Sequence, residues 1–125
     1  RLKYNLRYIF ELAGVQNVVV KNCRLNLKMP KDVTVRRAYK VKPLINDLGT
    51  PQIIDRKCSI ELADLQRNEK QSVLYELILP SRYAGVYRIA SVSVSYEIPG
   101  QGVYDNVDPQ DVTITYTDDP SQASV

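Results

Sequence analysis

Residues 86–98 read VYRIASVSVSYEI, and this stretch decides the fold of the 125-residue chain. Successive side chains of a β-strand point to opposite faces of its sheet, so a strand buried on one face alternates apolar with polar residues. Every second residue here is apolar: Ala90, Val92, Val94, Tyr96 and Ile98. The residues between them are small or charged: Ser91, Ser93, Ser95 and Glu97. The alternation predicts a long strand with one face on a core.

The same two-residue period recurs on both sides of this strand. It runs through residues 19–29, 33–41, 58–62, 73–79 and 112–116, with turn- or loop-forming residues between these segments. The strands do not alternate with helices, which argues against a parallel sheet and favours two antiparallel sheets packed face to face. We therefore predict a mainly β fold, an immunoglobulin-like antiparallel β-sandwich of about six to seven strands with an N-terminal helix.

The first segment has a different period. Its apolar residues share one helical face: Leu2, Leu6, Ile9, Phe10 and Ala13. Gly14 follows where glycine commonly ends a helix. The pattern predicts a helix near residues 2–13 and three regions: a helix in 1–14 linking to an upstream domain, a sandwich in 15–117 and a flexible tail in 118–125. Because so short a helix is marginal alone, Leu6 and Phe10 are expected to contact the sandwich, a partner, or a second copy in a homodimer.

The chain contains no histidine, which narrows its chemistry. Histidine is the base of Ser-His-Asp and Cys-His systems and a common zinc ligand. No other residue pattern marks a catalytic pair, so we predict a protein that is not an enzyme and holds no cofactor. The longest charge-free run, residues 12–20, is far shorter than the ~20 residues that span a bilayer, so no membrane span is expected.

Both cysteines, Cys23 and Cys58, lie on the predicted core faces of their strands. A disulfide between them requires the two strands to be close. Two buried free thiols are the commoner arrangement in an intracellular chain, and we prefer this interpretation. It slightly favours a cytoplasmic location.

One acidic segment and one basic segment are candidate binding sites. Asp105, Asp108 and Asp111 lie in one predicted loop and are candidate calcium ligands, but the spacing is not that of an EF-hand, and Asp is also a common turn residue. We prefer a surface loop without metal. The basic run comprises Lys31, Arg36, Arg37, Lys40 and Lys42. In a strand these side chains point to both faces, so we predict a solvated surface and no nucleic-acid partner.

Residues 84–87 read AGVY and resemble part of a tyrosine corner, in which the Tyr hydroxyl bonds to upstream backbone. This arrangement would turn Tyr87 and Ile89 inward, whereas the downstream alternation turns Ala90 inward. A β-bulge near residues 88–90 would reconcile the two phases. An ordinary strand start is the alternative.

Four segments together resemble a known family: NVVVKNCRLNLKMP at 17–30, VTVRRAYKV at 33–41, SVLYELILP at 72–80 and GVYRIASVSVSY at 85–96. They are similar to the β-rich accessory region that follows the von Willebrand factor A domain in prokaryotic A-domain proteins. The likeness covers roughly residues 1–117, and the Asp-x-Ser-x-Ser metal motif of the A domain itself does not occur in this sequence.

The resemblance implies a non-catalytic accessory or interaction module of a larger A-type protein. Such a module would pack against a neighbouring A domain or a partner protein. The small outward side chains Ser91, Ser93 and Ser95 are candidates for this contact, together with Leu6 and Phe10. The alternative is a calcium-dependent adhesin-like or carbohydrate-binding β-sandwich that uses the acidic loop.

Overall fold

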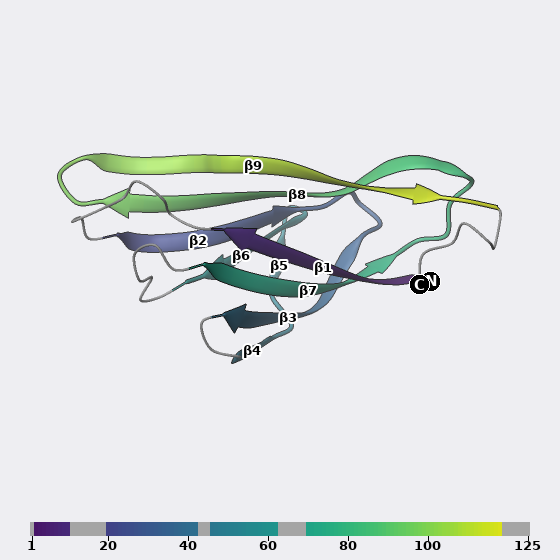
Figure 1. Ribbon diagram of the computed structural model, residues 1–125, viewed down its shortest axis with the longest axis horizontal. Helices are drawn as coiled ribbons and strands as arrows, with labels where there is room; N and C mark the ends of the chain where they lie inside the picture. Colours follow the sequence, from purple (N-terminus) through teal and green to yellow (C-terminus); the bar gives the residue numbers. More distant parts are fainter. Residues whose placement is uncertain (1, 11–19, 43–45, 63–69, 119–125) are drawn as a thin grey trace.

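Two antiparallel β-sheets pack face to face in the computed structural model, which describes residues 2–10, 20–42, 46–62 and 70–118 (Figure 1). The four-stranded sheet has the order β1-β7-β3-β4, and the five-stranded sheet has the order β5-β6-β2-β8-β9. The strands are β1 Leu2–Phe10, β2 Lys21–Lys28, β3 Thr34–Lys42, β4 Asn46–Gly49, β5 Ile53–Ile54, β6 Lys57–Glu61, β7 Gln71–Leu79, β8 Gly85–Ile98 and β9 Gly102–Tyr116.

The predicted mainly β, antiparallel character is confirmed, but the predicted N-terminal helix is wrong. Residues 2–10 form strand β1, which pairs with β7 from Leu2 opposite Leu79 to Phe10 opposite Gln71. Leu6 and Tyr8 are buried in the core, whereas the Ile9 side chain is 53% exposed. Ala13, Gly14 and the side chain of Phe10 lie outside the described residues.

The physical reason is that this segment carries two periods at once. Besides the helical stripe, Tyr4, Leu6 and Tyr8 alternate with the polar residues Lys3, Asn5 and Arg7. Pairing with β7 satisfies one edge of the β1 backbone, and packing against the other sheet buries Leu6 and Tyr8. This tertiary gain outweighs a marginal isolated helix.

The immunoglobulin-like assignment is not confirmed. In that fold the first two strands pair within one sheet. Here β1 and β2 lie in different sheets, and β2 pairs with β6 and β8 instead. The chain therefore passes between the sheets already after its first strand.

The core lies between the sheets and is built from the inward residues of their central strands. The four-stranded sheet contributes Val73, Tyr75, Leu77 and Leu79 from β7, and the five-stranded sheet contributes Leu25, Leu27, Val92 and Val94 from β2 and β8. Full burial of one such side chain stabilises the fold by about 1.5–3 kcal/mol. The alternation predicted for residues 86–98 is thus realised, with the apolar side on the core.

Bulges in the long β8–β9 hairpin explain one correct and one wrong prediction. The register shifts between Arg88 and Ala90, so that Ile89 and Ala90 are both buried, as the two conflicting phases predicted. The acidic segment at residues 105–111, by contrast, is part of strand β9 and not a loop. Asn106 and Asp108 have positive φ angles of 51° and 50°, and further register shifts in this part of the hairpin accommodate them.

Strand β1 begins and strand β9 ends on the same side of the sandwich, at the right in Figure 1. Leu2 lies opposite Leu79, and Gly85 lies opposite Tyr116. The segment Pro80–Ala84 links β7 to β8 at this same place. We call this region, made of Leu2, the turn at Pro30–Val33, Pro80–Val86 and Tyr116, the terminal end.

The predicted tail 118–125 lies outside the described residues except for Asp118. Within the part of the chain that is described, no helix has the length and hydropathy needed to cross a membrane.

Candidate functional site

The terminal end displays two large apolar side chains that the sandwich does not cover. Tyr83 is 91% exposed and Val86 is 69% exposed. Both residues follow the buried strand β7, which ends at Leu79. The chain has therefore left the core before it reaches Tyr83. Tyr83 and Val86 are therefore free to contact another molecule.

Two tyrosine hydroxyls hold the backbone on which Tyr83 sits. Tyr87 donates a hydrogen bond to the carbonyl oxygen of Tyr83 at 3.0 Å, and Tyr116 donates one to the carbonyl oxygen of Pro80 at 2.7 Å. The two rings meet edge to face, with centroids 5.3 Å apart and planes at 86°. The first of these bonds is the upstream backbone contact predicted for Tyr87. The result is a loop fixed near both of its ends.

Arg82 ties the loop to the neighbouring turn. Its guanidinium donates to the Asp32 carboxylate at 2.7 Å and lies 5.0 Å from the centroid of the Tyr87 ring. The ion pair joins Pro80–Ala84 to the turn at Pro30–Val33, and the ring contact adds a cation–π interaction. Arg82 thus connects both segments of the terminal end.

Gly85 allows the turn from the loop into β8. Its φ of +155° is a conformation that residues with a Cβ rarely adopt. A Cβ at this position would also meet the Tyr87 ring at 3.4 Å. That distance is an ordinary van der Waals contact, so the backbone conformation, and not a lack of space, calls for glycine here.

This arrangement suits recognition of a protein surface. Tyrosine and arginine are enriched among the residues that carry most of the energy of protein interfaces. A loop already held in place loses little conformational entropy when it binds, which favours affinity. Tyr83 thus extends an exposed side chain from a backbone that two hydrogen bonds hold in place.

The residues predicted as contact candidates are distributed differently. Leu6 is in the core and is not available to a partner. Ser91, Ser93 and Ser95 are half-buried on the outer face of the five-stranded sheet. Ser95 accepts a hydrogen bond from Asn26 at 3.2 Å, and Asn26 accepts one from Ser59 at 2.7 Å. At least one of the three serines therefore serves the internal polar network of the sheet.

The three candidate calcium ligands are spread along β9. Asp105 accepts from the backbone of Asn106 at 2.9 Å, Asp108 accepts from Gln110 at 3.5 Å, and Asp111 lies 3.8 Å from Arg88. Among the described residues, no group of three or more His, Cys, Asp or Glu is arranged to hold a metal ion.

Cys23 and Cys58 are both buried and free, in agreement with the preferred prediction. Cys58 lies opposite Leu27, four residues beyond Cys23 on β2. Four residues of strand span about 13 Å, which exceeds the ~7 Å between Cα atoms that a disulfide tolerates. Burial raises the pKa of each thiol to about 11.

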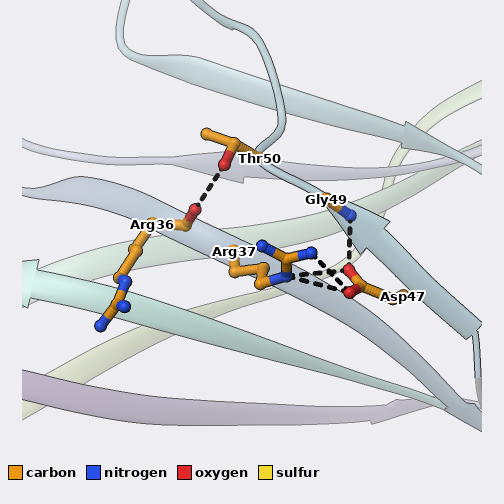
Figure 2. Close-up of polar contacts among 5 residues, drawn as sticks. All are labelled: Arg36, Arg37, Asp47, Gly49 and Thr50. Atoms are coloured by element: carbon orange, nitrogen blue, oxygen red, sulfur yellow. Dashed lines mark hydrogen bonds and ion pairs between the residues drawn. The ribbon is translucent and has the colours of Figure 1, made fainter.

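Two residues of the basic run, Arg36 and Arg37, point in different directions (Figure 2). Arg37 on β3 makes three contacts with the Asp47 carboxylate on β4, two from Nε at 3.0 Å and one from Nη2 at 2.6 Å, while the Arg36 side chain points away from this pair (Figure 2). These hydrogen bonds lower the pKa of Asp47. Thr50 donates to the backbone carbonyl of Arg36 at 2.9 Å (Figure 2). Arg36 and Arg37, which the sequence pattern assigned to a solvated surface, thus take part in the contacts that hold the edge strand β4 and Thr50 against β3.

Sequence reasoning missed Arg82, Tyr83, Val86 and Tyr116 as parts of a surface. Tyr83 gave a weak signal, because an aromatic residue stands there outside the alternating pattern. Val86 gave none, because it lies in the stretch 86–98 and in phase with Ala90. Arg82 and Tyr116 gave none, since their partners Asp32 and Pro80 are distant in the sequence.

No family model matches the chain, and no curated protein matches it. A solved structure, von Willebrand factor type A from Catenulispora acidiphila, has a similar fold, with a TM-score of 0.66 and 18% sequence identity. The likeness covers 83% of this chain and 25% of that one. This chain therefore spans about a quarter of the length of the structure that it resembles, and what the two share is the fold.

Proposed function

We propose that this domain is a non-catalytic interaction module of a larger von Willebrand factor A-type protein, and that its terminal end packs against a neighbouring A-type domain. The observation that carries the proposal is the exposed side chain of Tyr83, which projects from a loop held by two tyrosine hydrogen bonds at this end of the sandwich. The fold likeness supports it, because in the Catenulispora acidiphila structure the matching fold is a minor part of a longer chain.

The positions of the strand ends also support the terminal end as the contact surface. Because β1 begins and β9 ends at the terminal end, a domain joined through either strand by a short connection would lie beside Pro80–Val86. Tyr83 and Val86 supply apolar area at that place, and a fixed loop presents them without further ordering.

Hydroxyl-radical footprinting of the complete gene product tests this proposal, with Tyr104 as an internal control. Tyr83 is 91% exposed and Tyr104 is 39% exposed in the domain by itself, and both have the same intrinsic reactivity. Tyr104 lies near the turn at Pro99–Gln101, where β8 and β9 join, away from the terminal end.

We expect Tyr83 to be oxidised more slowly than Tyr104, because the neighbouring domain covers it. Oxidation of Tyr83 that is faster than that of Tyr104, in the order of their exposure in the domain, would show that the terminal end is open and would refute the proposed contact.

A further inference from the structure

A depression of about 530 Å³ opens on the five-stranded sheet and shares no lining residue with the terminal end. It is lined by Lys28, Gln52, Ile54, Asp55, Lys57 and Ser59. Its volume lies within the ~300–1,000 Å³ typical of small-molecule sites. The lining combines two cations, one carboxylate, an amide, a hydroxyl and one apolar wall.

The positions of the two lysines do not stabilise the sheet. Lys28 on β2 lies directly opposite Lys57 on β6. Like charges opposite one another on neighbouring strands repel and destabilise a sheet. Within the described residues neither lysine forms an ion pair or a hydrogen bond. The pair therefore brings two positive charges together on adjacent strands, and neither lysine has an ion-pair partner within 4 Å among the described residues.

The Cβ atoms of directly opposed residues are ~4.5–5.5 Å apart, so two flexible lysine stems can bring their ammonium groups to one anion. A phosphate or sulfate group has several oxygens that accept such charged hydrogen bonds, and it would remove the repulsion between Lys28 and Lys57. An anionic group is thus the part of a ligand that this pair fits.

The remaining lining groups fit hydroxyls. Asp55 accepts hydrogen bonds only, and the Ser59 hydroxyl already donates its proton to Asn26 at 2.7 Å, which leaves its oxygen as an acceptor. A bare anion would be repelled by Asp55 and would offer Ser59 nothing. A hydroxylated carbon frame would donate to both groups and rest its C–H surface on Ile54, which is exposed.

We propose that this depression binds a phosphate or sulfate ester of a polyol, with Lys28 and Lys57 on the ester group and Asp55 and Ser59 on the hydroxyls. This site does not depend on the proposed contact at the terminal end.

Titration of the ¹⁵N-labelled chain with four probes tests the site: glucose 6-phosphate, glucose 6-sulfate, glucose and inorganic phosphate. At least one of the two esters should shift the amide signals of Lys28, Lys57 and Ser59 and bind about tenfold more tightly than glucose or inorganic phosphate. The comparison of the two esters tells which anion the site prefers. Failure of both esters to shift these signals, or binding of inorganic phosphate as tight as that of the esters, would overturn the proposal.

Three variants separate the site from general charge effects. Lys28→Gln and Lys57→Gln should each weaken ester binding about tenfold, whereas Lys31→Gln, an equal charge change at an exposed lysine in the Pro30–Val33 turn, should not. Lys28→Gln should also raise the melting temperature, because it removes the like-charge pair. Equal weakening by Lys31→Gln would contradict a specific site.

Asp55→Asn tests the hydroxyl half of the site. Asn tolerates the positive φ of 52° found at this position, so the hairpin should fold normally. Loss of the negative charge should strengthen binding of inorganic phosphate and weaken the preference for the ester. An unchanged ratio of the two affinities would show that Asp55 takes no part in recognition.

Discussion

Two tyrosine hydroxyls decide where the loop that carries Tyr83 lies. The bond from Tyr87 to Tyr83 joins residues four apart, and the resemblance of AGVY to a tyrosine corner offered it as one of two alternatives. The bond from Tyr116 to Pro80 spans 36 residues and left no sequence signal. A single residue could thus be assigned a role where its partner was near in sequence, and not where the fold supplied the partner.

Tyr116→Phe should lower the free energy of unfolding by about 1 kcal/mol, because it removes a 2.7 Å hydrogen bond to the Pro80 carbonyl and leaves the ring in place. Tyr83→Ala is the matched variant and should change it by less than about 0.5 kcal/mol, since the ring contacts solvent in the domain. Urea denaturation of the two variants measures both values. A larger loss for Tyr83→Ala than for Tyr116→Phe would place the Tyr83 ring in the fold and not on a display surface.

The buried thiols predict a loss of stability in alkali. Burial raises the pKa of Cys23 and Cys58 from 9.0 to about 11, so the folded chain holds these protons at a pH where the unfolded chain has lost them. The two protonated thiols contribute fully to the free energy of unfolding below about pH 9, and this contribution is lost as the pH rises through about 11. Burial, followed by the nearby Asp108 charge, likewise raises the pKa of Tyr8 to about 12.

Urea midpoints measured between pH 8 and pH 11 should therefore fall, and Cys58→Ala should show a smaller fall from its lower starting value. A midpoint that stays constant in wild type over this range would contradict buried, protonated thiols.

At the scale of elements, the strands with a single period were predicted and the strand with two periods was not. Residues 90–98 alternate without a competing pattern, and their burial followed the prediction. Strand β1 carries both a helical stripe and an alternation, and its pairing partner β7 begins 61 residues after β1 ends. Pairing with that distant strand favours the strand conformation over the helix, and the local sequence of β1 does not reveal this pairing.

The bulges divide in the same way. The bulge at Arg88–Ala90 was predictable because two apolar phases collided there. The bulges near Asn106 and Asp108 could not be predicted from the sequence. Asp, Asn and Pro are as common in loops as they are at the bulges of an edge strand. Bulges, Pro109 and negative charge also protect this long edge strand from pairing with other chains.

The strand β1 makes a prediction that distinguishes it from the helix. Leu6→Ala should cost about 2–4 kcal/mol of unfolding free energy, because Leu6 is buried in the core. Ile9→Ala should cost less than about 0.5 kcal/mol, because Ile9 points outward and is 53% exposed. Thermal or chemical denaturation of both variants is sufficient. Similar losses of unfolding free energy for both variants would contradict strand β1, because Leu6 and Ile9 share a face only in a helix.

At the scale of the whole molecule, composition and alternation predicted two packed antiparallel sheets, and the structure contains them. The strand order could not be predicted, because alternation says which face of a strand is buried and not which strand lies beside it. The same limit applied to both surfaces described above. The terminal end joins four segments that are distant in the sequence, and the Lys28–Lys57 depression joins β2 to the β5–β6 hairpin.

The central claim is that the terminal end packs against an A-type domain, and site-specific photo-crosslinking tests it most directly. A photoreactive phenylalanine analogue replaces Tyr83 in the complete gene product, and in a control variant it replaces Val103, which is 73% exposed near the Pro99–Gln101 turn. Mass spectrometry identifies the crosslinked peptides. We predict crosslinks from position 83 to peptides of an A-type domain and none to that domain from position 103. Absence of such peptides at position 83, or their equal recovery at both positions, would contradict the account.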